Sequence, residues 1–132
     1  MNSWRTSEVS ASRNELLAFV RADGRRQRIL ARRAGSFIGR LRGLIGQPLP
    51  AQASGLWIEP CASVHTFGVR GLLDLVFVST CMVVLRIDAA VPSRRVRAAA
   101  GARAVLELRA GEAERLGLRA GTRLAWDQGE TR

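Results

Sequence analysis

Residues 73–79, Leu-Asp-Leu-Val-Phe-Val-Ser, decide the fold class of this chain. Apolar and β-branched side chains fill nearly every position, and residues 82–87 have the same character. Continuous apolar runs of this length are typical of strands covered on both faces, whereas a strand with one solvated face alternates. We therefore expect two buried strands at the centre of the fold.

Short apolar runs around this pair predict further strands. They fall at residues 56–58, 63–69, 94–97, 103–108 and 122–126. Residues 111–116 are predicted to form one helical turn closed by Gly117, and Gly121 is expected to take a positive φ in the turn that follows. Many short strands with little helix indicate a mainly β fold, a small closed or partly open β-barrel or sandwich.

The segment before residue 55 adds a hairpin and a helix to this prediction. Residues 15–20 and 28–31 are apolar and flank an Asp-Gly turn signal, which favours a β-hairpin; a short helix over residues 13–21 is the competing interpretation. Ser36 is suited to cap an amphipathic helix that ends at Gly46, because the apolar residues between them recur at three- and four-residue spacings. Residues 48–54 would then form a loop.

The length of 132 residues, 47% of them apolar, suits one domain with its own core. We place this domain at residues 15–126, between a disordered arm at 1–14 and a fraying tail at 127–132. The arm lacks the apolar core of a signal peptide, and the longest apolar run, residues 72–85, is too short to span a bilayer. We expect a cytoplasmic protein with no membrane span. The spacing of Cys61 and Cys81 permits a disulfide, but nothing in the sequence indicates an oxidising compartment.

The composition excludes several kinds of site. The chain has 21 basic and 11 acidic residues, a net charge of +10, and every basic residue is an arginine. The absence of lysine and tyrosine excludes a lysine nucleophile, a Schiff base, a P-loop lysine and a tyrosine acid. With one histidine and two cysteines, a four-ligand Cys/His zinc site is impossible. We predict neither a metal nor a cofactor, although Cys61, His65 and Asp74 with a water are a conceivable set of ligands.

The residues suited to chemistry are concentrated in one short segment. They are Cys61, Ser63, His65, Thr66, Arg70 and Asp74. Side chains alternate along a strand, so the first three are expected to project from one face as a row of thiol, hydroxyl and imidazole. Asp74, returning on a neighbouring strand, is placed to orient the imidazole.

Three interpretations of this cluster stay open. In the first, His65, Thr66, Arg70 and Asp74 bind a small anionic ligand or a protein partner, with the planar guanidinium of Arg70 suited to an anionic group. In the second, the chain is a hydrolase or transferase that uses a Cys61 thiolate beside His65. In the third, the cluster is structural and its polar groups satisfy one another. We favour a binding or accessory module over an enzyme.

The basic segment at residues 21–42 offers another function. It holds eight arginines and one acidic residue, a local balance of +7, which is attractive to a nucleic acid or another polyanion. Aromatic residues that would stack on bases are scarce, and Phe37 and Trp57 are expected in the core. No helix-turn-helix or zinc-finger signature is present. A solvated basic surface is therefore the preferred interpretation.

Three stretches of this chain together resemble one known family. The first is Ser-Phe-x-x-Arg-Leu-Arg-Gly-Leu-Ile-Gly at residues 36–46, and the second is Pro-Cys-x-Ser-Val-His-Thr-Phe-Gly-Val-Arg at residues 60–70. The third is Ala-Arg-Ala-Val-Leu-Glu-Leu-x-Ala-Gly at residues 102–111, extended by Gly-Leu-Arg-Ala-Gly at 117–121. They resemble the prokaryotic family catalogued as domain of unknown function 192, over about residues 26–126. The resemblance implies a compact β-rich fold with a short helix, and no established reaction.

The chain departs from the pattern of that family at two places. Where the family usually has Met-Arg-Phe-Pro-Ile-Asp, residues 69–74 are Val-Arg-Gly-Leu-Leu-Asp, so the aromatic residue and the proline are replaced. Where the family has a hairpin turn of the Asp-Gly type, residues 79–81 are Ser-Thr-Cys. The change at Gly71, Leu72 and Leu73 leaves open whether a site of the family persists here.

Overall fold

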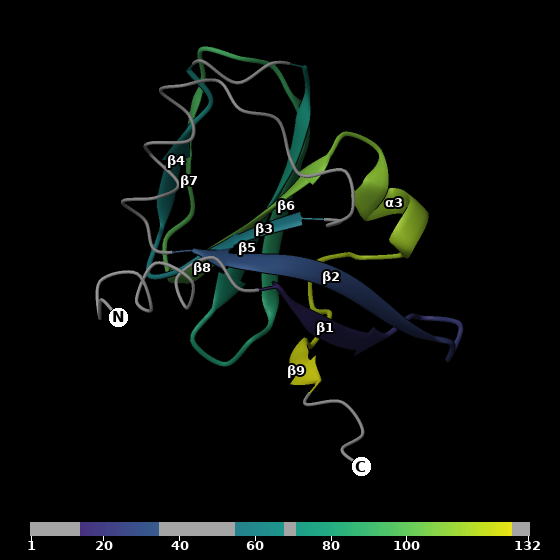
Figure 1. Cartoon of the computed structure of the whole chain (residues 1–132). Coiled ribbons are helices and arrows are strands. Elements are labelled where there is room, and N and C mark those ends of the chain that lie inside the picture. The colour runs from purple at the N-terminus through teal and green to yellow at the C-terminus, as the bar shows by residue number, and fades with distance from the viewer. Residues whose placement is uncertain (1–13, 35–54, 68–70, 128–132) are drawn as a thin grey trace, which may run out of the picture.

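The computed structural model describes residues 14–34, 55–67 and 71–127 (Figure 1). The fold is mainly β, with 59% of the described residues in strands and 6% in the helix, which confirms the predicted class. The strands are β1 (Asn14–Val20), β2 (Arg26–Ala34), β3 (Gly55–Ile58), β4 (Ser63–His65), β5 (Leu73–Ser79), β6 (Val84–Val91), β7 (Val96–Ala98), β8 (Ala102–Arg109) and β9 (Ala125–Asp127). The helix is α3 (Glu112–Leu116), and no described helix is long and apolar enough to cross a membrane.

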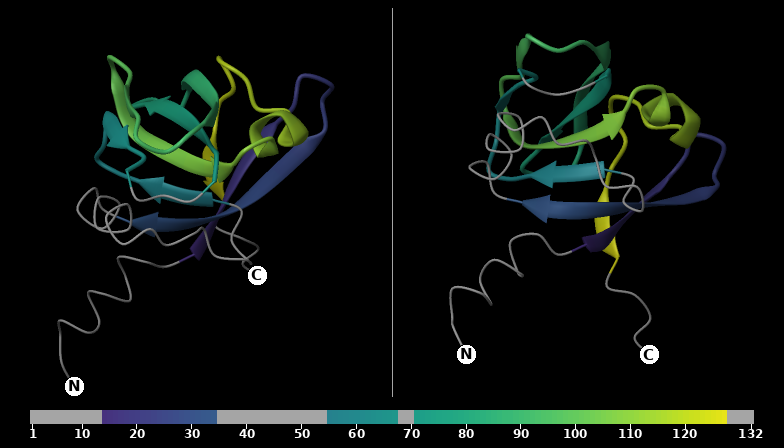
Figure 2. Two further views of the ribbon diagram at one scale, coloured as in Figure 1. Left: turned by 90° about the horizontal axis from the view of Figure 1, so that it is seen from above. Right: turned by 45° about the horizontal axis from the view of Figure 1, so that its top comes forward.

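Seven strands form one sheet in the order β6-β5-β8-β3-β2-β1-β9, while β4 and β7 form a separate two-stranded sheet. All pairs are antiparallel except β2 with β3. The prediction of a closed barrel is wrong. The two edges of the large sheet meet only at an isolated bridge between Val83 and Arg123, because the chain then continues into β9, which pairs with β1. In Figure 2 the β1–β2 ribbon runs across the β5–β8 strands rather than alongside them.

Strand β5 lies between two hydrophobic clusters. Leu73, Leu75 and Phe77 belong to the cluster that also contains Val64 of β4. The alternate residues Val76 and Val78 belong to the larger cluster, which includes β1, β2 and α3. The prediction that residues 73–79 are covered on both faces is confirmed, and the continuous apolar run follows from it.

The prediction of cover on both faces is wrong for residues 82–87. Strand β6 is at the edge of the sheet, and Leu85 is 38% exposed. The strand also begins later than expected, at Val84, because Met82 has φ 64° within the turn that joins Ser79 N–H to the carbonyl of Val83.

The predicted hairpin between β1 and β2 is confirmed, and the competing helix over residues 13–21 is wrong. Its turn is closed by the Arg21 N–H, which donates to the Arg25 carbonyl at 2.8 Å, and Gly24 has φ 87°. The helical turn is confirmed as α3, with Gly117 at φ 81° at its C-terminus, and Gly121 has the expected positive φ of 94°. The predicted amphipathic helix at 36–46 with Phe37 and the loop at 48–54 lie outside the described residues. Of the arm predicted at 1–14 only Asn14 is described, as the first residue of β1, and of the tail predicted at 127–132 only Asp127, as the last residue of β9.

Candidate functional site

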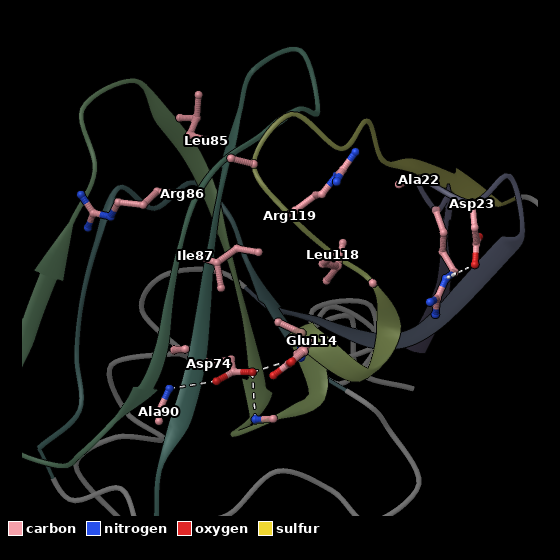
Figure 3. A pocket seen from close by; sticks show the side chains of 16 residues that line it. Ala22, Asp23, Asp74, Leu85, Arg86, Ile87, Ala90, Glu114, Leu118 and Arg119 are labelled. Atoms are coloured by element: carbon pink, nitrogen blue, oxygen red, sulfur yellow. Dashed lines mark hydrogen bonds and ion pairs between the residues drawn. The ribbon is translucent and has the colours of Figure 1, made fainter.

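Asp74 lies on β5 and is buried, with 1% exposed. Its carboxylate accepts hydrogen bonds from three backbone amides. Oδ1 accepts a hydrogen bond from the N–H of Ala90 at 2.9 Å, and Oδ2 accepts from the N–H groups of Gly111 and Ala113 at 3.0 Å each. These amides belong to the end of β6 and to the first turn of α3. Asp74 therefore fixes the helix and the edge strand relative to each other (Figure 3).

The expected contact between Asp74 and His65 is not formed. Asp74 lies on the face of β5 that carries Val76, whereas β4 packs against the opposite face through Val64. All the hydrogen bonds of the carboxylate are with backbone amides. The two residues that were expected to act together are thus separated by the sheet.

His65 is half-buried at the end of β4, opposite Val96 of β7. Its ring lies 5.8 Å from that of Phe67, centroid to centroid, and its Nδ1 atom is buried with no hydrogen-bond partner among the described residues. An imidazole that lacks an orienting partner on Nδ1 does not have the arrangement of a general base held by a third group.

Thr66 is buried and joins the end of β4 to the loop between β6 and β7. Its hydroxyl donates to the Pro92 carbonyl at 2.7 Å and accepts from the Arg95 N–H at 2.9 Å. Its own backbone N–H donates to the Arg95 carbonyl at 2.8 Å. The structural interpretation therefore accounts for Thr66.

Replacement of this hydroxyl should destabilise the fold. Thr66→Val keeps the shape of the side chain but leaves the Pro92 carbonyl and the Arg95 N–H without this partner, so we expect a loss of about 1–3 kcal/mol in the free energy of unfolding. Thr80→Val, at an exposed turn position, is the matched control and should change stability by less than about 0.5 kcal/mol. Urea denaturation measures both. Equal losses for the two variants would contradict the structural role of Thr66.

Cys61 and Ser63 precede and begin β4. The Sγ of Cys61 lies 3.2 Å from the carbonyl oxygen of Ser63, to which its thiol donates. Arg70 lies outside the described residues. Among the described residues, no group of three His, Cys, Asp or Glu is arranged to hold a metal ion.

The described fold contains a cleft of about 860 Å³. It lies between β6, α3, the loop after α3 and the tip of the β1–β2 hairpin (Figure 3). The apolar side chains that line it are Leu85, Ile87, Ala89, Ala90, Ala113, Leu118 and Ala120. Asp74 lies at one end, so the buried carboxylate positions the two walls of this cleft.

Most charged groups of the cleft are already paired. Arg21 lies 3.5 Å from Asp23 and donates to the Arg115 carbonyl at 3.3 Å. The pKa of Asp23 is lowered, chiefly by the hydrogen bond from the Arg25 N–H, so the carboxylate is ionised at neutral pH. Arg86 forms two hydrogen bonds with Asp88, of 2.8 and 3.1 Å.

Two charged side chains of the cleft have no such partner. Arg119 and Glu114 are exposed, and the described residues give neither side chain an ion pair or hydrogen bond. In Figure 3, Arg119 lies at the end near Leu85 and Glu114 at the end near Asp74. The cleft thus offers one free positive and one free negative group.

The arginines of the β1–β2 hairpin are partly neutralised. Arg28 lies 3.0 Å from Asp127, and Arg33 lies 3.4 Å from Glu15 and packs on the ring of Trp126 at 4.5 Å. Such pairing lowers the positive potential that a polyanion would meet along the described part of the basic segment. This is the arrangement expected of a solvated surface.

A comparison with protein-family models shows to which family the chain belongs. The model of domain of unknown function 192, described as uncharacterized ACR, matches residues 18–126. The chain belongs to this family. No specific function is established for domain of unknown function 192, and no curated protein matches the chain.

Two solved structures share the fold of this member of domain of unknown function 192. A candidate transcription regulator of Sinorhizobium meliloti 1021 is 24% identical, with a TM-score of 0.75, over 88% of this chain and 95% of that one. A protein of unknown function from Novosphingobium aromaticivorans DSM 12444 is also 24% identical, with a TM-score of 0.70, over 89% of each chain. At this identity the likeness concerns the fold alone.

Sequence reasoning found one residue of the cleft and missed the rest. Asp74 was recognisable because it interrupts an apolar strand. Leu85 and Ile87 were taken for core, since an apolar edge strand has the same composition as a buried one. Arg119 lies in a Gly-flanked turn that carries no chemical motif, so only the folded chain reveals its place.

Proposed function

We propose that this domain is a binding module, and that its site is the cleft between β6 and α3 rather than the face of β4. The observation that supports the proposal is the cleft itself. It has a volume of about 860 Å³ and a mainly apolar lining with few free polar groups. Ligand sites typically have volumes of roughly 300–1,000 Å³ and this kind of lining.

The apolar part of the lining suits the hydrophobic body of a ligand. Leu85 and Ile87 occupy alternate positions of β6, and Leu118, which follows α3, lies across from Ile87 (Figure 3). Leu85 is 38% exposed and Leu118 is buried, so a ligand in the cleft would remove apolar surface of the edge strand from water. Burial of such surface contributes roughly 25 cal/mol per Å².

Arg119 gives the ligand its expected charge. Its guanidinium has no ion pair among the described residues, and it can donate two parallel hydrogen bonds to a carboxylate or phosphate. The net charge of +10 also favours the approach of an anion. A small ligand with an apolar body and an anionic group is therefore the class that we propose.

Octanoate, which combines these two features, is a suitable probe. We expect Arg119→Glu to weaken octanoate binding at least about tenfold, because a charge-assisted hydrogen bond contributes roughly 1.5–3 kcal/mol. Binding of the neutral analogue octanamide should change little. Titrations monitored by NMR amide shifts measure both affinities.

Arg123→Glu is the matched control, because Arg123 is exposed and lies outside the cleft lining. It makes the same change of net charge and should leave octanoate affinity within about twofold, since the two sites share no ligand contact. If both variants weakened octanoate equally, the attraction would be unspecific. If octanoate did not bind the unmodified chain, the proposal would fail.

We also propose a cytoplasmic location. Cys61 and Cys81 are both free thiols in the structure, which is the state that the cytoplasm maintains. A thiol count on protein taken directly from its host cells, under acid quenching, tests this. Two reactive thiols per chain are expected, and a disulfide would contradict the location.

A further inference from the structure

The edge strand β6 of the large sheet is paired on its outer side along only part of its length. The beginning of β6 pairs with the segment before β9: Val84 N–H donates to the Thr122 carbonyl at 2.8 Å, Gly121 N–H to the Val84 carbonyl at 2.8 Å, and Leu124 N–H to the Met82 carbonyl at 2.7 Å. This pairing ends at Gly121, where the chain turns away from β6. Among the described residues, the remainder of β6 has no strand on this side.

The cleft runs along this unused edge. Residues 85, 86 and 87 line it in succession, although successive side chains of a strand point to opposite faces and the Arg86 side chain bonds Asp88 and the Ala98 carbonyl. A cavity that lay on one face would be lined by alternate residues only. The cleft therefore borders the backbone edge of β6, where unpaired N–H and C=O groups can receive another strand.

The free charges are placed at opposite ends of this edge. Arg119 is close to the start of β6, because Gly121, two residues later, bonds to Val84. Glu114 is close to the end of β6, because Ala113 and Ala90 share the Asp74 carboxylate. Figure 3 shows the same order along the cleft.

We propose that the ligand is a short peptide with free termini that adds to β6 as an antiparallel strand. This inference rests on the proposed function and names the class of ligand. Addition of an extended peptide to a sheet edge obtains affinity from backbone hydrogen bonds and specificity from the side-chain positions along the cleft.

The charges determine the direction of the peptide. An antiparallel peptide has its N-terminus beside the end of β6, where its amine meets Glu114, and its C-terminus beside the start of β6, where its carboxylate meets Arg119. A parallel peptide would bring each terminus to a like charge. Residues 85–89, which precede the positive φ of Ala90, span about 14 Å when extended, the length of a strand of about five residues.

The floor of the cleft determines which side chains fit. Leu85, Ile87 and Ala89 occupy alternate positions on β6 and line the cleft together with Leu118. Alternate side chains of the peptide would meet this surface, and the others would point to solvent. A peptide with apolar residues at positions one, three and five suits it best.

The experiment uses the full chain and the pentapeptide Val-Thr-Val-Thr-Val in three forms. One form has free termini, one is acetylated and amidated, and one has free termini and a methylated amide at its central residue. We expect the blocked form to bind at least about tenfold more weakly, and the methylated form about tenfold more weakly, because each loses hydrogen bonds to the protein. Contacts between Hα atoms of the peptide and of β6 in NMR spectra should report an antiparallel register.

Variants of the free charges provide the controls. Arg119→Gln and Glu114→Gln should each weaken the free peptide about tenfold and leave the blocked peptide unchanged, whereas Arg123→Gln should affect neither. If the blocked peptide binds as tightly as the free one, recognition of the termini is refuted. If octanoate binds and no form of the peptide does, the peptide inference is overturned while the proposed function stands. If neither binds, both fail.

Discussion

Asp74→Ala should lower the free energy of unfolding far more than any exposed substitution. The change removes a single acceptor group from three backbone N–H donors, of which that of Ala113 is buried. Each unsatisfied buried donor costs about 1–3 kcal/mol, and water can reach the other two, so we expect a loss of about 3–5 kcal/mol in the free energy of unfolding. Urea denaturation monitored by tryptophan fluorescence measures it.

Asp23→Ala is the matched control for this prediction. Asp23 also accepts a hydrogen bond from a backbone N–H, that of Arg25 at 3.0 Å, but at an exposed turn. Its removal should destabilise the fold much less than that of Asp74, because water replaces the lost acceptor. A loss of similar size at Asp23 and Asp74 would contradict the view that Asp74 fastens α3 and β6 together within the buried part of the fold.

Trp57→Ala, at another point of the sheet, should lower the free energy of unfolding by a comparable amount. Trp57 is 1% exposed on β3, and its Nε1–H donates to Oε1 of Glu59 at 2.9 Å. Its ring meets that of Trp126 edge to face, with centroids 5.0 Å apart. Truncation of a buried tryptophan to alanine costs about 3–5 kcal/mol, and thermal and urea denaturation measure this loss.

A double-mutant cycle separates the ring contact from the burial. Trp57→Leu and Trp126→Leu, singly and together, keep a large apolar side chain at each position but remove the aromatic ring. We expect a coupling free energy of about 0.5–1.5 kcal/mol, the range typical of aromatic pairs. Additive losses would show that the edge-to-face contact contributes nothing beyond buried area, and a loss below about 1 kcal/mol for Trp57→Ala would contradict its place in the core.

Local patterns in the sequence predicted where strands occur but not all of their bounds: the strands expected at 63–69 and 122–126 are β4 at Ser63–His65 and β9 at Ala125–Asp127. The run at 73–79 coincides with β5, and the helical turn and its closing glycine coincide with α3 and Gly117. The edge position of β6 was not predictable, because composition records which side chains are apolar and not which strands are neighbours. The incomplete closure of the sheet was missed for the same reason: it depends on how far residues 121–124 follow β6 before they turn towards β1.

The candidate site also shows that proximity along the sequence does not tell which residues meet in the fold. Proximity along the sequence suggested that His65 and Asp74 act together, yet β5 presents Asp74 to the cluster on its other face. Thr66 was correctly singled out as a polar residue with partners, but those partners are backbone groups of Pro92 and Arg95. Residues that line the cleft come from four separate segments, and no periodicity in the sequence connects them.

Amide shift mapping of octanoate on the full chain tests the central claim most directly. The cleft predicts that the largest shifts fall at residues 85–90 and 111–120, with smaller ones at the hairpin tip of residues 21–23. Shifts concentrated at Cys61, Ser63 and His65 would return the site to the face of β4. Shifts confined to the exposed arginines at residues 25–28 would show only attraction of an anion to a basic surface, and would contradict a ligand site between β6 and α3.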